Sequence, residues 1–222
     1  MTGAASAREQ VAAACRRLAA EGLVRATSGN VSALAGEDRV AITPTGGVLG
    51  ELEAKDITVV DLDGAVVEGG LAPTSEIALH LGVYRRYGAG AVVHTHAPAA
   101  TALGLVLDEL PCVHYEMLAL GGAVRVAPYR TFGTPELADT VLEALNGRTA
   151  ALMANHGALA HAGDVDAAVQ LSLLLEWACT VYWRAAAIGN PRVLDDEALG
   201  AVLNAVAEQG YGTTRPLEQE ER

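Results

Sequence analysis

Three histidines stand where short apolar runs of the sequence end, and together they could hold a metal ion. His94 and His96 close the segment AVVHTH, and His156 follows AALMAN. Alternate side chains of a strand project to the same face, so His94 and His96 are predicted to lie side by side. Three imidazoles with a fourth position open form the ligand set of a catalytic zinc ion. The pattern therefore predicts a metal site, although any single histidine is more often a hydrogen-bonded structural residue.

Two more titratable residues belong to the segment PTSEIALHLGVYRRYG, residues 73–88. A proline and two hydroxyl residues before an apolar periodic stretch predict a helix capped by Thr74 or Ser75. Glu76 in the first turn is explained by the helix dipole alone, or it is a base beside the metal. His80 lies one turn further along the same face. Because the other three histidines already fill a zinc site, His80 is predicted to be structural.

Three polar turns contain the groups that bind anions. TSGNVS at residues 27–32 and TPTG at residues 43–46 combine hydroxyls with glycines, and Thr74 and Ser75 precede the predicted helix. Each turn alone has an ordinary explanation, since Gly-Asn and Thr-Pro are common in turns. Backbone amides of such loops and of a helix start can also hold an anion. Together with the metal site, the turns predict a phosphorylated small-molecule substrate.

Length and composition narrow the class of protein. The chain has 222 residues, of which 51% are hydrophobic and 19% charged, as expected for a single domain over residues 1–222. No apolar run approaches the ~20 residues of a membrane helix. Charged residues interrupt the N-terminal segment where a signal peptide would be apolar, so the cytoplasm is the expected location and no membrane partner is expected. The net charge of −12, without a basic stripe, argues against a nucleic-acid partner.

Helices and short strands are predicted to alternate along the chain, and they must position these residues. Apolar periodicity predicts helices at 6–21, 73–88, 135–147, 165–188 and 196–210, with short strands between them and a hairpin turn at Asp63 and Gly64. Residues 212–222 form a charged tail that is expected to be mobile. The pattern describes a mixed layered domain with helices packed on a sheet.

Several segments together resemble a known family. Over about residues 8–211 the chain is similar to the class II aldolase family typified by L-fuculose-1-phosphate aldolase, through TSGNVS, ITPTG, PTSE, AVVHTHAPAATAL, HYEM, APYRTFGT and NHGAL in this order. The resemblance implies an α/β fold with a central, mostly antiparallel nine-stranded sheet and helices on both faces. It also implies Zn²⁺ as cofactor, with Mn²⁺ or Co²⁺ as alternatives, and a homotetramer with active sites at subunit interfaces.

The resemblance assigns roles at the metal and phosphate ends of the site by position. His94, His96 and His156 would bind the metal. Glu76 would coordinate the free ion and act as the base once substrate displaces it. The substrate phosphate would be held by Gly29, Asn30, Thr45, Gly46, Thr74 and Ser75.

Three aromatic residues match positions at the aldehyde end. Tyr115 corresponds to a tyrosine that protonates the aldehyde oxygen from the neighbouring subunit, and Phe132 and Tyr211 correspond to residues of the aldehyde pocket. Plain aromatic packing is the alternative explanation for Tyr115 and Phe132, and Tyr211 could simply follow a helix end.

The activity that the resemblance implies is zinc-dependent cleavage of L-fuculose 1-phosphate or a 5-deoxy-ribulose 1-phosphate to dihydroxyacetone phosphate and a small aldehyde, through a metal-stabilised enediolate. Lys55 is the only lysine, which agrees with a route that needs no Schiff base. The alternatives within the family are methylthioribulose-1-phosphate dehydratase, L-ribulose-5-phosphate 4-epimerase and a metal-dependent decarboxylase. Tyr115 and Phe132 favour the aldolase over the epimerase. An adducin-like interaction module is the non-catalytic alternative, which the retained histidines disfavour.

Overall fold

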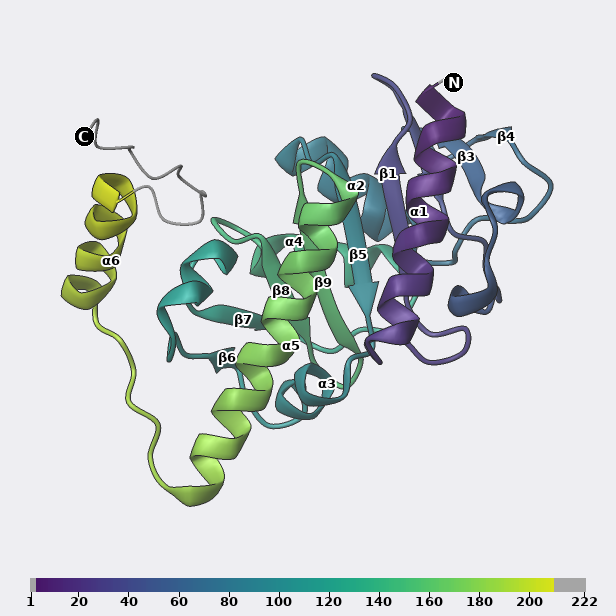
Figure 1. Ribbon diagram of the computed structural model, residues 1–222. Coiled ribbons are helices and arrows are strands. Elements are labelled where there is room, and N and C mark those ends of the chain that lie inside the picture. The colour runs from purple at the N-terminus through teal and green to yellow at the C-terminus, as the bar shows by residue number, and fades with distance from the viewer. Residues whose placement is uncertain (1–2, 210–222) are drawn as a thin grey trace, which may run out of the picture.

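A single sheet runs through the centre of the computed structural model, which describes residues 3–209 (Figure 1). Within these residues the sheet has nine strands in the order β4-β3-β2-β1-β5-β9-β8-β7-β6. Neighbouring strands are antiparallel, except that β7 and β8 are parallel. This confirms the predicted fold. The strands are β1 (Asn30–Leu34), β2 (Arg39–Ile42), β3 (Thr58–Asp61), β4 (Val66–Glu68), β5 (Ala91–Thr95), β6 (Glu109–Leu110), β7 (Val124–Ala127), β8 (Ala150–Met153) and β9 (Gly157–Ala162).

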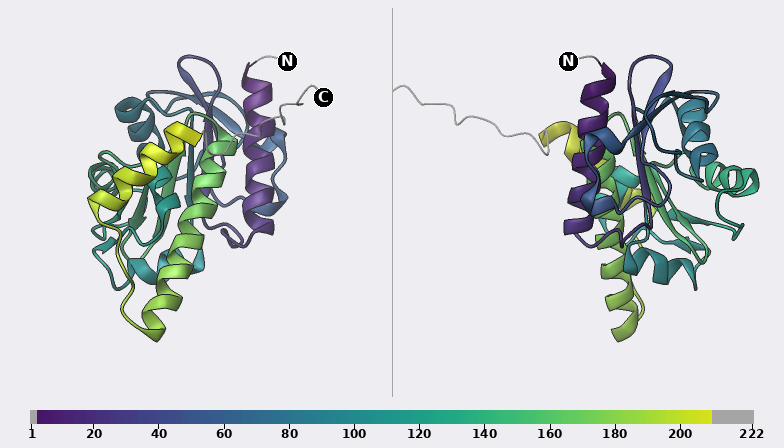
Figure 2. Two further views of the ribbon diagram at one scale, coloured as in Figure 1. Left: turned by 60° about the vertical axis from the view of Figure 1, so that its left-hand side comes forward. Right: turned by 90° about the vertical axis from the view of Figure 1, so that its right-hand side faces the viewer.

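Helices cover both faces of the sheet (Figure 2). One face packs against α1 (Gly3–Ala20), α3 (Pro98–Gly104) and α5 (Val165–Ile188), and the opposite face packs against α2 (Ile77–Tyr87) and α4 (Pro135–Ala144). The last helix, α6 (Asp196–Gln209), contacts the 3₁₀ segment η3 (Tyr115–Leu120) at the side of the molecule. Two further 3₁₀ turns, η1 (Leu49–Glu51) and η2 (Ala54–Asp56), lie beside α1.

Strand β5 shows why the sheet needs helices on both sides. Ala91 and Val93 belong to the core beneath α1, α3 and α5, whereas Val92 belongs to the core beneath α2 and α4. Side chains of a strand alternate between the two faces, so a strand buried on both faces is apolar throughout. The run AVV before His94 therefore identifies a central strand, and it brings this histidine to the strand end in a fully buried position.

Side chains cap the N-termini of α4 and α5. Thr134 Oγ1 accepts a hydrogen bond from Leu137 N–H (3.3 Å) at the start of α4, and Pro135 occupies its first turn. Asp164 Oδ1 accepts from Ala167 N–H (2.8 Å) at the start of α5. Such side-chain acceptors satisfy amides that the helix leaves unbonded.

The predicted cap of α2 is wrong by one or two residues. The helix begins at Ile77, and Glu76 rather than Thr74 or Ser75 occupies the N-cap position, without a capping side-chain bond. Thr74 Oγ1 accepts instead from Glu76 N–H (3.3 Å), which closes a tight turn ahead of the helix. The carboxylate of Glu76 is therefore free to point away from the helix.

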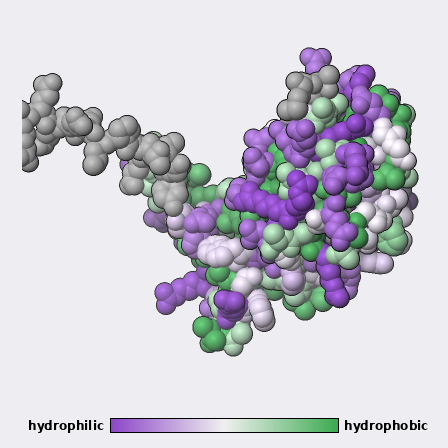
Figure 3. Space-filling model, turned by 45° about the vertical axis from the view of Figure 1, so that its right-hand side comes forward, coloured by the Kyte–Doolittle hydropathy of each residue, from purple (hydrophilic) through white to green (hydrophobic). Residues whose placement is uncertain are grey.

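The surface combines hydrophilic and apolar side chains, which are interspersed on the face shown in Figure 3. Among residues 3–209, no helix is both long and apolar enough to cross a bilayer. The predictions for Tyr211 and for the tail at 212–222 lie outside the described residues.

Candidate active site and metal centre

The three predicted histidines meet where three adjacent strands begin or end. Strand β5 ends just after His94, β1 begins at Asn30, and β9 begins just after His156. The antiparallel register sets Asn30 opposite His94 and His94 opposite Leu159. Segments distant in the sequence therefore place their polar ends at one edge of the sheet.

The imidazole rings form a compact triangle. Their centroids lie 4.8, 4.9 and 5.0 Å apart, and their potential ligand atoms all lie within 4.8 Å of one another. The Nε2 atoms of His94 and His96 are 3.0 Å apart. Two nitrogens on one tetrahedral zinc ion are separated by about 3.3 Å, given Zn–N bonds of about 2.05 Å. The triangle therefore has the dimensions of a metal-binding set.

The hydrogen bond of His94 fixes which ring nitrogen faces the centre. Its Nδ1 lies 2.9 Å from the carbonyl oxygen of Ala158, which can only accept, so Nδ1 carries the hydrogen. In the neutral ring Nε2 then has a free lone pair, as a metal ligand requires. Burial, with smaller contributions from neighbouring histidines, lowers the pKa of His96 and of His156 to about 4, so both rings are neutral at pH 7.

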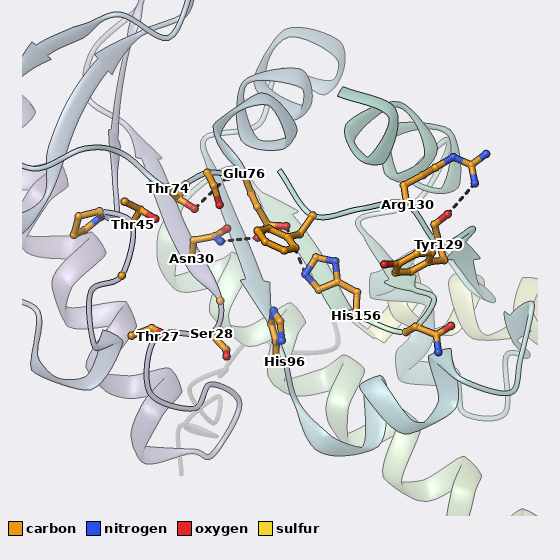
Figure 4. A pocket seen from close by; sticks show the side chains of 16 residues that line it. Thr27, Ser28, Asn30, Thr45, Thr74, Glu76, His96, Tyr129, Arg130 and His156 are labelled. Carbon is orange, nitrogen blue, oxygen red and sulfur yellow. Dashed lines mark hydrogen bonds and ion pairs between the residues drawn. The ribbon is translucent and has the colours of Figure 1, made fainter. Parts of the chain in front are cut away.

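Glu76 faces the same centre. Its Oε2 lies 3.2 Å from His94 Nε2. Figure 4 shows its two other contacts: Oε2 accepts from Asn30 Nδ2 (2.8 Å), and Oε1 lies 3.5 Å from His156 Nε2. Burial acts to raise the pKa of this carboxyl group, but His94, the Asn30 bond, His156 and His80 together outweigh burial and lower it. The group is therefore a carboxylate at neutral pH.

The imidazole nitrogens and the carboxylate oxygen at this centre are suited to bind a divalent cation. Among the described residues, Glu76 Oε1 is buried and accepts no hydrogen bond. An unbonded buried carboxylate oxygen beside a bare imidazole lone pair is unfavourable, and a cation satisfies both. Three imidazoles with one carboxylate match the nitrogen and oxygen ligands of zinc.

Two glycines allow the backbone to close around this centre. A Cβ atom on Gly157 would lie 2.2 Å from Thr95 O, so only glycine lets β9 start beside β5 after His156. At Gly29, φ is 96°, and a Cβ atom would lie 2.8 Å from His94 O. Glycine is the residue that adopts this φ without strain, so it brings the 27–30 loop against the histidine strand.

The polar loops lie together on one side of a cavity of about 560 Å³ (Figure 4). Thr45 N–H donates to Ala72 O and Thr74 N–H donates to Thr43 O, each at 3.0 Å, so the loops around residues 45 and 74 are bonded together. With the amides of Thr45 and Thr74 used in this way, the hydroxyls of these loops are the groups that can donate to an anion. The cavity is lined by Thr27, Ser28, Gly29, Asn30, Pro44, Thr45, Gly46, Thr74, Ser75, Glu76, His96, Tyr129, Arg130, Phe132, Asn155 and His156.

The cavity lining includes every predicted phosphate-binding residue, together with Glu76, Phe132, His96 and His156. His94 is fully buried behind it. Within one chain Tyr115 lies elsewhere: it lines a separate apolar groove with Leu174 and Val202. The side chain of Asn30, predicted to bind phosphate, is directed instead to Glu76 and His80.

Sequence reasoning did not single out several lining residues. Tyr129 and Arg130 lie in the segment APYRTFGT, and Thr27 and Ser28 lie in TSGNVS, so adjacency to motif residues was the available signal. Among the described residues that line the cavity, Arg130 is the one arginine or lysine. Its guanidinium points outward and donates to the carbonyl oxygen of Tyr129 (2.8 Å; Figure 4).

Comparison with known proteins identifies the family of the chain. The sequence profile described as Class II Aldolase and Adducin N-terminal domain matches residues 9–183. The chain belongs to this family. Family membership and the histidine triangle together make it a metal-dependent enzyme of the lyase class.

Two curated relatives and one solved structure cover nearly the whole chain. The 5-deoxy-D-ribulose 1-phosphate aldolase of Bacillus thuringiensis is 37% identical over 92% of this chain and 96% of its own length. The 5-methylthioribulose-1-phosphate/5-deoxyribulose-1-phosphate aldolase of Rhodospirillum rubrum is 36% identical over 91% of this chain and 92% of its own. A solved L-fuculose 1-phosphate aldolase superposes with a TM-score of 0.87 at 35% identity, covering 91% of this chain and 96% of its own.

Proposed function

We propose that the protein is a single-domain, zinc-dependent class II aldolase that cleaves a ketose 1-phosphate to dihydroxyacetone phosphate and a small aldehyde. The observation that carries this proposal is the triangle of imidazoles with an unbonded Glu76 oxygen beside a cavity lined by hydroxyls. The names of the relatives, aldolases of 5-deoxyribulose 1-phosphate and L-fuculose 1-phosphate, support this substrate class.

The phosphate of the substrate would bind at the polar loops. The chain carries a net charge of −12, so its overall field repels an anion and local donors must compensate. The turns at Gly29 and Gly46, with the hydroxyls of Thr45, Thr74 and Ser75, provide such donors on one wall of the cavity. Both polar ends of the Asn30 side chain are bonded to protein, and its backbone stands opposite His94 in the β1–β5 ladder, so the second hydrogen of its amide nitrogen is what remains for the phosphate.

The reacting carbons would then lie near Glu76. A bound divalent ion would act there as a Lewis acid for negative charge that develops on the carbonyl oxygen of the substrate. Glu76 is ionised and has one free oxygen, so it can take up or return a proton on the dihydroxyacetone phosphate carbon. His94, His96 and His156 would hold the ion through their ring nitrogens.

The aldehyde end would be completed by a second subunit. Phe132 lines the cavity, but Tyr115 does not, so a Tyr115 that acts on the leaving oxygen must come from another copy of the chain. Large apolar side chains are exposed around α5 and α6, including Trp183 at 57%, Ile188 at 92% and Leu203 at 56%. Exposed apolar surface of this kind marks protein interfaces. We therefore propose a homotetramer with interfacial sites.

The expected compartment remains the cytoplasm. In the described part of the chain, Cys15, Cys112 and Cys179 are unpaired and buried, which suits a reducing environment.

A coupled assay tests the reaction. Purified enzyme is stripped of metal, reloaded with zinc and incubated with 5-deoxyribulose, methylthioribulose and L-fuculose 1-phosphates. Aldehyde and dihydroxyacetone phosphate are then measured with specific reductases. The proposal expects both products in equal amounts, only after reloading. Water loss without carbon–carbon cleavage would indicate the dehydratase instead, and carbon dioxide release from an acid would indicate the decarboxylase.

Mixed tetramers test the shared site. Glu76→Gln and Tyr115→Phe should each be nearly inactive alone, because each removes one proton-transfer group from every site. Mixing and reassembling the two variants creates some sites with an intact Glu76 from one subunit and an intact Tyr115 from another. Activity should return on mixing. Activity that stays at the level of the separate variants would argue against an interfacial Tyr115.

A further inference from the structure

A chain of buried hydrogen bonds connects Tyr84 to Glu76 beneath the cavity. Tyr84 Oη lies 2.7 Å from Ser32 Oγ, which lies 2.6 Å from His80 Nδ1. His80 Nε2 lies 2.5 Å from Asn30 Oδ1, and Asn30 Nδ2 lies 2.8 Å from Glu76 Oε2. None of these five side chains belongs to a residue more than 6% exposed. Water therefore does not compete for these bonds.

The chain of bonds is built from two elements with matching periods. Glu76, His80 and Tyr84 follow one another at four-residue spacing along one side of α2 and its N-cap. Asn30 and Ser32 are two residues apart and share one side of β1. Four-residue spacing on a helix and two-residue spacing on a strand each align side chains, so the two rows alternate in the chain.

The donors and acceptors can have only one order. Glu76 is a carboxylate and accepts, so Asn30 presents its NH₂ group to Glu76 and its carbonyl oxygen to His80. His80 Nε2 must then carry the hydrogen. Burial, with repulsion from His94, lowers the pKa of His80 to about 3, so the ring is neutral and Nδ1 accepts from Ser32. Ser32 in turn accepts from Tyr84.

We propose that His80 is a positioning residue for the lyase reaction: through Asn30 it fixes the carboxylate of Glu76, holding Oε2 and leaving Oε1 directed at the metal centre. This inference rests on the proposed role of Glu76 and goes beyond it by explaining what orients that group. Asn30 Nδ2 is the hydrogen-bond donor to Glu76, and His80 Nε2–H holds the other end of the same amide by donating to Asn30 Oδ1.

Loss of the donor at Nε2 would act on Glu76 indirectly. Without it, the buried carbonyl oxygen of Asn30 has no hydrogen-bond donor, so the Asn30 side chain is no longer fixed at both ends and Nδ2 can shift away from Glu76 Oε2. The carboxylate would then lose its fixed donor and turn, and Oε1 would no longer face His156. A misplacement of this kind, of about 1 Å, can reduce turnover about 100-fold.

Two matched substitutions separate positioning from simple core packing. In His80→Gln the amide nitrogen reaches about as far as Nε2 and can still donate to Asn30. In His80→Asn the shorter side chain reaches only the position of Nδ1, so the contact with Ser32 is kept and the donor to Asn30 is lost. Both variants remove the same ring, so a role confined to packing predicts similar defects in both.

The first readout does not depend on turnover. Co²⁺ is loaded in place of zinc, and its visible absorption spectrum reports the carboxylate at the ion. The spectrum of His80→Asn should resemble that of Glu76→Gln, and the spectrum of His80→Gln should resemble that of the wild type. Metal stoichiometry should be unchanged in all of them, because the three ligand histidines remain.

The second readout is turnover. His80→Asn should lower kcat about 10- to 100-fold with KM changed less than about threefold, whereas His80→Gln should stay within about threefold of the wild type. In a Glu76→Gln background, His80→Asn should lower kcat no further, since the group that it positions is already absent. If His80→Asn does not fold, Ser32→Ala carries the test: it removes the donor to Nδ1 and should lower kcat about 3- to 10-fold with the same spectral change.

A wild-type spectrum in His80→Asn, or in Ser32→Ala where His80→Asn does not fold, would overturn the inference. Equal losses in His80→Asn and His80→Gln would also overturn it, in favour of core packing. A wild-type enzyme that binds cobalt but cleaves no ketose 1-phosphate would overturn the proposed function, and the spectra would still decide the role of His80.

Discussion

Acidification of the metal-free protein should reveal the buried, neutral state of His80. The pKa of this ring is lowered from 6.5 to about 3, mainly by burial and then by repulsion from His94. Attraction by Glu76 acts in the opposite direction but is smaller. Between these pH values the unfolded chain binds a proton that the folded chain does not. The free energy of unfolding therefore falls as the pH falls through this window, and the contribution of His80 is complete only above its ordinary pKa.

The size of this effect follows from the shift. At about pH 5 an unfolded histidine lies about 1.5 units below its ordinary pKa, and each unit corresponds to about 1.4 kcal/mol, so protonation favours the unfolded state by about 2 kcal/mol. Other groups titrate in the same range, including His96 and His156. The useful quantity is therefore a difference between two proteins: the stability that the wild type loses on acidification minus the loss in His80→Gln, which cannot titrate at that position.

Urea unfolding followed by far-UV circular dichroism measures both losses, at about pH 8 and about pH 5, with chelator present and the protein concentration fixed. The wild type should lose about 2 kcal/mol more than His80→Gln. Equal losses would mean that the ring is already protonated or solvated in the folded protein. The order of donors assigned between Ser32 and Asn30 would then be refuted.

Other perturbations act on the site directly. Glu76→Gln should keep stoichiometric zinc, measured by metal analysis, yet lower kcat about 100- to 10,000-fold, because an amide cannot accept the proton; full activity would remove Glu76 from the mechanism. Gly29→Ala should lower both thermal stability and metal content, because the added Cβ would lie 2.8 Å from His94 O. The control is Gly70→Ala, which should leave both unchanged, because a Cβ there meets nothing within 4 Å. Zinc at about 100 times its Kd should stabilise the stripped protein by about 2.7 kcal/mol in urea unfolding, and an unchanged midpoint would contradict binding to the folded state.

The sequence predicted that the three histidines lie together, because the determinants of their positions are local. Histidines at the ends of AVV and AALMAN can only emerge at strand ends once those runs are buried, and the register of β5 with β9 then brings them together. The layered fold, the hairpin at Gly64 and the extents of most helices likewise follow from apolar periodicity and turn residues.

Other features depend on contacts that no local pattern encodes. The contacts of the Asn30 side chain with Glu76 and His80 were not predicted, because they depend on how α2 packs next to β1. The N-cap of α2 was misplaced for a related reason, since Thr74 bonds to the amide of Glu76 rather than to a helical amide. The position of Tyr115, away from the cavity of its own chain, was expected only from the family resemblance, because it depends on how η3 folds and not on a local pattern.

The proposed ligands belong to segments about sixty residues apart, on β5 and at the entrance to β9. A nascent chain cannot capture zinc at such a site before these two strands have paired, in contrast to short cysteine motifs that trap an ion while still unfolded. The metal would therefore bind after these strands have paired, and it would not start the folding of the chain.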